Sequence, residues 1–141
     1  MIDEKMTLPA IGETITTARA RALCLERGAM FDYIVKRIDD HPGDFKDWIF
    51  DGASLLPDNL VAKLFHIPHL IEIALKHDLK YAYGELGNKE ERFRADQEFK
   101  QDLLADGTHP WVAEVMFKMV RLGGSEKLKT SFSWGFARIV R

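Results

Sequence analysis

An inward-facing histidine, aspartate and tyrosine make the stretch around His77 the part of the chain best equipped for chemistry. The spacing predicts a helix from Leu70 to Tyr83, and at about 100° per residue His77, Asp78 and Tyr81 fall within its apolar arc. A histidine that faces a carboxylate is an oriented general base. The neighbouring carboxylate projects about 100° away around the helix, where it is free to hold a hard cation.

The carboxylate expected to face this histidine is Asp96, within a second predicted helix from Lys89 to Ala105. Apolar residues three positions before it and three and seven positions after it place Asp96 centrally in the apolar stripe. An unpaired buried carboxylate is expensive. We therefore expect the two helices to pack antiparallel across the turn at Gly84 to Asn88, with their inward polar groups paired.

The alternative is a structural hydrogen-bond network that only ties the two helices together, which is the usual outcome for one inward histidine. Here a histidine, two aspartates and a tyrosine face inward within 20 positions of the chain. Clustering of titratable groups is typical of functional sites, and it favours function over the structural alternative.

The first of these helices also has a narrow polar stripe, formed by Glu72, Lys76, Lys80 and Tyr83. Glu72 precedes Lys76 by four positions, the favourable orientation for an ion pair on a solvent-exposed face. We expect this stripe to face water.

Composition predicts a single globular domain. The chain has 141 residues, of which 46% are hydrophobic and 30% charged, enough for one sizeable core. The net charge of −2 gives no electrostatic case for a nucleic-acid partner. Cys24 is the only cysteine, so no internal disulfide can form and a reducing compartment is expected.

Neither a signal peptide nor an apolar stretch of membrane-spanning length is visible in the sequence. We expect the protein to be cytoplasmic when it is made. If it acts elsewhere, a partner protein or delivery system must carry it, or it must be associated with a virion.

The predicted fold is mainly α with a small β component (α+β): the antiparallel helix pair carries the site, a small β-hairpin precedes it, and a short strand follows near the C-terminus. The hairpin rests on partial alternation of aromatic and aliphatic residues on both sides of a turn at His41 to Asp44. Outside the helix pair, the expected elements are a loose arm (Met1–Ala10), a helix (Thr14–Arg27), the hairpin strands (Phe31–Ile38 and Phe45–Phe50), a short helix (Asn59–His66), a helix opening near Pro110, and an edge strand in the tail (Thr130–Arg141).

The tail has a second interpretation. Phe132, Trp134 and Phe136 alternate along it, and Lys127, Lys129, Arg138 and Arg141 surround them. Besides an edge strand, such an aromatic and basic segment is typical of a surface that touches lipid headgroups. We favour the strand.

Several motifs resemble those of known families. His77-Asp78-Leu79-Lys80-Tyr81 resembles the H-D-x-x-Y motif of phospholipases A2, and Asp96 follows His77 by 19 positions, which looks most like the compact, cysteine-poor phospholipase domain of parvoviral capsid proteins. A longer succession is similar to an uncharacterised bacterial and bacteriophage family. Its motifs appear here as Asp51-Gly52-Ala53-Ser54, His77-Asp78, Tyr81, Ala95-Asp96 and Arg121-Leu122-Gly123-Gly124.

The resemblance to phospholipases A2 implies an ester hydrolase that acts on a glycerophospholipid or membrane surface, in lipid degradation. His77 would be the general base that activates water, Asp96 the carboxylate that orients it, and Tyr81 the side chain that braces this His–Asp dyad. Such a mechanism needs no covalent nucleophile.

The same resemblance implies calcium as the cofactor, with Asp78 as its ligand. The glycine-rich calcium loop of phospholipases A2 is absent, and Asp51-Gly52-Ala53-Ser54 occupies the corresponding place in motif order. Its small residues let backbone oxygens approach a ligand, and Asp51 adds charge. We therefore expect Asp51, Gly52 and Ser54 to join Asp78. The alternative is an ordinary loop leaving a strand.

Three other functions stay open. One is a metal-dependent phosphohydrolase, in which His66 or His69 joins His77, Asp78 and Asp96 around a transition metal. Pro68 disfavours one helix through both of the first two histidines, which weakens that prediction. The others are a non-catalytic structural or interaction protein, such as a phage particle component, and an inhibitor or effector that needs a partner.

Overall fold

The structure is a computed structural model that describes residues 7–52 and 67–139. Its fold is mainly helical with one small two-stranded antiparallel sheet, as the sequence predicted. The order of elements is β1 (Glu13–Ile15), α1 (Thr17–Arg27), a 3₁₀ turn (Ala29–Phe31), α2 (Asp32–Asp40), β2 (Trp48–Phe50), α4 (Leu70–Ala82), α5 (Lys89–Ala105), α6 (Pro110–Gly123) and a second 3₁₀ turn (Glu126–Leu128).

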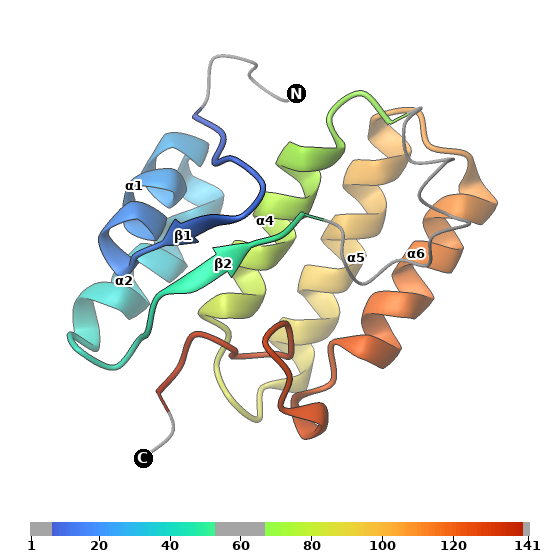
Figure 1. Cartoon of the computed structure of the whole chain (residues 1–141). Coiled ribbons are helices and arrows are strands. Elements are labelled where there is room, and N and C mark those ends of the chain that lie inside the picture. Colours follow the sequence, from blue (N-terminus) through green and yellow to red (C-terminus); the bar gives the residue numbers. More distant parts are fainter. Residues whose placement is uncertain (1–6, 53–66, 140–141) are drawn as a thin grey trace.

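The helix α4 lies at the centre of the fold. Figure 1 shows α4, α5 and α6 side by side in an up-and-down arrangement, with α1 and α2 on the other side of α4. Leu75 and Leu79 of α4 belong to a core cluster shared with α1, α2 and β2, whereas Ile73 belongs to a second cluster shared with α5 and α6. Because both sides of α4 are covered, few of its positions can face water.

This central place overturns the polar stripe expected on α4. Glu72 and Lys80 are only 3% and 4% exposed. Glu72 receives two hydrogen bonds from the Arg27 guanidinium of α1, at 2.9 and 2.6 Å, instead of pairing with Lys76. Lys76 pairs with Asp102 of α5, 3.1 Å away. The predicted ion pair within the helix is wrong because neighbouring helices cover that face and supply the partners.

One of the two predicted strands is found, because β2 (Trp48–Phe50) lies within the predicted strand Phe45–Phe50. Phe31 to Ile38 is not a strand, because Asp32–Asp40 is the helix α2. Its buried residues recur at helical spacing, since Phe31, Ile34, Val35 and Ile38 all face the core. The helical spacing of these apolar residues therefore determined the structure, and the partial strand-like alternation did not. β2 instead pairs with β1, Glu13 opposite Phe50 and Ile15 opposite Trp48, so a small antiparallel pair does precede the helix pair.

The first helix starts later than expected, because Thr14 and Ile15 belong to β1. Thr16 accepts a hydrogen bond from the Arg19 N–H at 3.1 Å and caps α1. Of the expected N-terminal arm, residues 1–6 lie outside the described part of the chain. Thr7 contacts α1, donating its hydroxyl to Glu26 at 2.6 Å. The helix expected at Asn59–His66 also lies outside the described residues.

The tail forms turns where an edge strand was expected, and this prediction is wrong. One isolated bridge joins Arg138 to Phe45. Three backbone donors of the segment bond near helix ends: the N–H of Gly135 donates to the Tyr81 carbonyl at 2.8 Å, that of Trp134 to the Gly124 carbonyl at 3.0 Å, and that of Ala137 to the Ala82 carbonyl at 3.1 Å. The tail therefore closes over the C-terminal ends of α4 and α6.

None of the helices in the described ranges is long and apolar enough to cross a membrane.

A substitution at Gly124 would test the close packing at these helix ends. A Cβ built there would lie 2.5 Å from Tyr81 Cε2 and 2.7 Å from the Val120 carbonyl oxygen. Gly124→Ala should therefore cost about 1–3 kcal/mol through overpacking, measured as a fall in melting temperature. Leu122→Ala, at a position that is 77% exposed in the same region, should change stability by less than about 0.5 kcal/mol. Equal melting temperatures for both variants would contradict this packing.

Candidate functional site

The packing of α4 against α5 brings His77 and Asp96 together. His77 Nε2 lies 2.8 Å from Asp96 Oδ1, and the Tyr81 hydroxyl donates to the same oxygen at 2.7 Å. Asp96 is 0% exposed and His77 6%. The predicted contact of these three inward side chains across the helix pair is confirmed.

Two arginines complete the network. Arg121, in the last turn of α6, donates from Nη1 to Asp96 Oδ2 at 2.7 Å. Arg92 of α5 donates from Nε to the Tyr81 hydroxyl oxygen at 3.1 Å. Neither arginine was expected to take part in the site. Arg121 stood within a recognised motif, and Arg92 precedes Asp96 by four positions and so shares its side of α5.

The hydrogen bonds assign the protons of this cluster. Burial raises the pKa of the Asp96 carboxyl, but donation from His77, Tyr81 and Arg121 outweighs burial and holds that pKa below its usual value. Asp96 is therefore ionised at neutral pH and can only accept. Arg92 donates to the Tyr81 oxygen, so the hydroxyl proton is left for Asp96. In the neutral imidazole of His77 the proton must be on Nε2, which leaves the lone pair on Nδ1.

Aromatic rings hold the imidazole in place. The His77 ring centroid lies 4.4 Å from that of Tyr81 and 4.6 Å from that of Phe99. Trp134 from the tail meets Tyr81 edge-on at 5.0 Å. This packing restricts the imidazole to one orientation, and a preorganised orientation is what a general base requires.

Asp78 lies beside the dyad but faces a different space. With Asp51 it lines a cavity of about 420 Å³ whose other lining residues are Lys46, Asp47, Trp48, Ile49, Ser131, Phe132 and Phe136. Burial, with the negative charge of Asp51 as a second cause, raises the pKa of Asp78 well above its usual value. Asp78 therefore faces the loop that begins at Asp51, as the sequence predicted.

The donor chemistry of this cavity suits a hard cation. Three acidic residues, Asp47, Asp51 and Asp78, line it together with Lys46. Burial is the main cause of the raised pKa of Asp78, and the second cause, the negative charge of Asp51, is charge that a cation would compensate. Of the other predicted ligands, Gly52 follows Asp51 directly with φ of 72°, and Ser54 lies outside the described residues. Within residues 7–52 and 67–139 no group of three histidine, cysteine or acidic side chains is placed to hold a metal. Backbone oxygens and water would have to complete any calcium shell.

His69 does not join the transition-metal cluster expected for a phosphohydrolase. His69 precedes the first turn of α4, where its Nδ1 lies 2.7 Å from Asp106 Oδ1. His77 is two turns further along, about 12 Å at 1.5 Å per residue. The structure does not bring His69 to His77 and Asp78. His66 lies outside the described residues.

The chain matches no protein-family model, no curated protein and no solved structure. Its function therefore has to be inferred from its own residues. They offer an oriented imidazole whose Nδ1 has no hydrogen-bond partner in residues 7–52 and 67–139 and, one residue further along α4, a carboxylate that faces a separate cavity.

The ionised state of Asp96 predicts a specific response to acid. A carboxyl whose pKa is lower when folded than its unfolded value of about 3.9 gives stability that is present above that pH and lost as pH falls through the folded pKa. Asp96→Asn should therefore lower the melting temperature at pH 7 by roughly 5–10 °C. It should also flatten the wild-type loss of stability below about pH 4.

Calorimetry from pH 2 to pH 7 measures both effects. Glu90→Gln, at an exposed position of the same helix, is the control and should keep the wild-type acid limb. An Asp96→Asn variant with an unchanged acid limb would show that Asp96 is not ionised in the folded protein.

Proposed function

We propose that the protein is a calcium-dependent, phospholipase A2-like hydrolase in which a His77–Asp96 dyad activates water to cleave an ester of a glycerophospholipid. The observation that supports this most is the 2.8 Å contact between His77 Nε2 and Asp96 Oδ1. It occurs within an H-D-x-x-Y sequence whose tyrosine donates to the same carboxylate.

The dyad would work by general base catalysis. Nδ1 of His77 takes a proton from water while the water oxygen forms a bond to the ester carbonyl carbon. Asp96 remains ionised, keeps the imidazole in its Nε2–H tautomer and stabilises the imidazolium. The imidazolium then returns the proton to the leaving alcohol oxygen as the bond from the carbonyl carbon to that oxygen breaks. No side chain forms a covalent intermediate.

The cavity lined by Asp78, the residue after His77, would receive the rest of the substrate. Asp51 and Asp78 would hold calcium, which would supply positive charge for the lipid phosphate and the developing oxyanion. Trp48, Phe132 and Phe136 give the cavity apolar walls, which suit the hydrocarbon part of a lipid and limit the access of water.

A structural brace is the second candidate. It is favoured by the burial of His77 and Asp96, at 6% and 0% exposure, and by the full set of donors around the carboxylate. Buried polar groups are normally satisfied in this way whether or not they do chemistry. Calcium-dependent hydrolysis that depends on His77 distinguishes an enzyme from a brace.

The direct test is hydrolysis of phosphatidylcholine vesicles that contain phosphatidylglycerol, in millimolar calcium. His77→Ala should reduce the rate by roughly 10²- to 10⁴-fold, the usual contribution of a general base. The control is His41→Ala, because His41 is an exposed histidine in the turn after α2, and it should keep the wild-type rate. No hydrolysis by the folded wild type, or equal rates for wild type and His77→Ala, would contradict the proposed function.

Asp78→Asn tests the calcium site separately. It should reduce hydrolysis at low calcium and recover part of the rate at higher calcium, because the dyad stays intact while a charged ligand is lost. Calcium should raise the melting temperature of the wild type, since it binds only the folded state, and should raise that of Asp78→Asn less. Identical calcium responses of the two proteins would exclude Asp78 as a ligand.

A further inference from the structure

The two oxygens of the Asp96 carboxylate have separate partners. Oδ1 accepts from His77 and from the Tyr81 hydroxyl, whereas Oδ2 accepts from Arg121 Nη1. His77 and Tyr81 belong to α4, Asp96 to α5 and Arg121 to α6. The orientation of the carboxylate, and with it the imidazole, therefore depends on a helix that carries neither member of the dyad.

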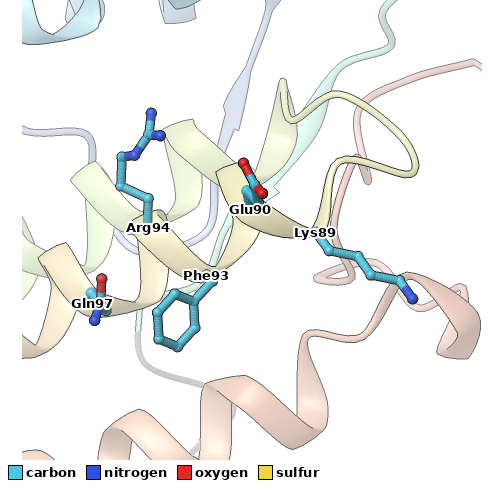
Figure 2. A pocket seen from close by; sticks show the side chains of 5 residues that line it. All are labelled: Lys89, Glu90, Phe93, Arg94 and Gln97. Carbon is cyan, nitrogen blue, oxygen red and sulfur yellow. The ribbon is translucent and has the colours of Figure 1, made fainter.

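Arg121 is itself held from two sides. Its guanidinium carbon lies 5.2 Å from the centroid of the Phe93 ring, within the range of a cation–π contact. Figure 2 shows Phe93 projecting from α5 toward α6. Arg92 donates to the backbone carbonyls of Val120 and Arg121. Side chain and backbone of Arg121 are thus both fixed against α5, which is more than a surface ion pair requires.

We propose that Arg121 is a positioning residue of the dyad: by occupying Asp96 Oδ2 it fixes the carboxylate plane, so that Oδ1 alone meets His77 and Nδ1 is kept as the free nitrogen. The effect of Arg121 on catalysis rests on the proposed function. Without the guanidinium the carboxylate can turn about its terminal torsion, which is broad. Either oxygen could then meet the imidazole, and its orientation would loosen.

Another arginine–carboxylate pair, which joins α1 to α4 and is more deeply buried than Arg121 with Asp96, serves as a control. Arg27 donates to both oxygens of Glu72 on α4, and the two side chains are 1% and 4% exposed. Glu72 is five positions before His77 and, within the described residues, forms no hydrogen bond with His77, Tyr81 or Asp96. Arg27→Gln should destabilise the fold in the way that loss of any buried pair does, without changing the state of His77.

The test compares Arg121→Gln, Arg121→Lys and Arg27→Gln with the wild type in two measurements. The first is hydrolysis of phosphatidylcholine–phosphatidylglycerol vesicles in saturating calcium. Arg121→Gln should lower kcat by about 10- to 100-fold, as loss of partners that orient metal-bound histidines does. KM should stay within about twofold, because Arg121 is placed to contact the carboxylate and not the substrate. Arg121→Lys, which keeps a cationic donor, should recover part of kcat.

The second measurement is the ¹⁵N spectrum of His77 at one neutral pH, which reports the tautomer independently of activity. The wild type, Arg27→Gln and, in large part, Arg121→Lys should have the proton on Nε2, whereas Arg121→Gln should give a mixture of tautomers. A tautomer change in a protein without lipid hydrolysis would support the positioning role of Arg121 and reject the proposed function. Wild-type kcat and a wild-type tautomer in folded Arg121→Gln would overturn the positioning role while leaving the proposed function intact.

Discussion

The charge of Asp96 is the constraint on which the rest of the site depends. An ionised carboxylate with no exposed surface is tolerated only if donors replace the water it has lost. Here α4 supplies two donors and α6 supplies the third. Removing one partner of a buried charged pair typically costs about 3–5 kcal/mol. The ionised state of Asp96 therefore depends on the packing of these three helices, which brings the donors to the carboxylate.

Other features of the fold maintain this arrangement. Arg92 joins the Tyr81 hydroxyl to the carbonyls at the end of α6. Gly124 allows the Tyr81 ring to approach the chain just after α6, and Trp134 of the tail packs on the same ring. Tyr81 is therefore the point where α4, α5, α6 and the tail meet. A change at any of them would be transmitted to the hydrogen bonds of Asp96.

The sequence predicted those features correctly that depend on the spacing of nearby residues. The helix 89–105 has the predicted bounds and the helix starting at Leu70 ends one residue earlier than predicted. The contact of His77 with Asp96 followed from the cost of burying a carboxylate in an apolar stripe. The strand expected at 31–38 failed because partial alternation was preferred to an equally visible helical period.

Partners supplied by distant segments could not be read from local spacing. Glu72 was assigned to Lys76, four positions away, because nothing in the sequence indicated that Arg27 would lie over it. Arg121 stood in a motif, but only the packing of α6 on α5 shows which oxygen it meets. The strand β1, the partner of β2, was missed for the same reason, since pairing of β1 with β2 spans two intervening helices.

The most direct measurement of the central claim is neutron diffraction from a crystal of the wild-type protein exchanged into deuterium oxide at neutral pH. Deuterium should appear on His77 Nε2 and on the Tyr81 hydroxyl, both directed at Asp96 Oδ1, with none on Asp96 and none on His77 Nδ1. Deuterium on the Asp96 carboxyl, or on Nδ1 with Nε2 bare, would contradict an ionised carboxylate that orients a free base.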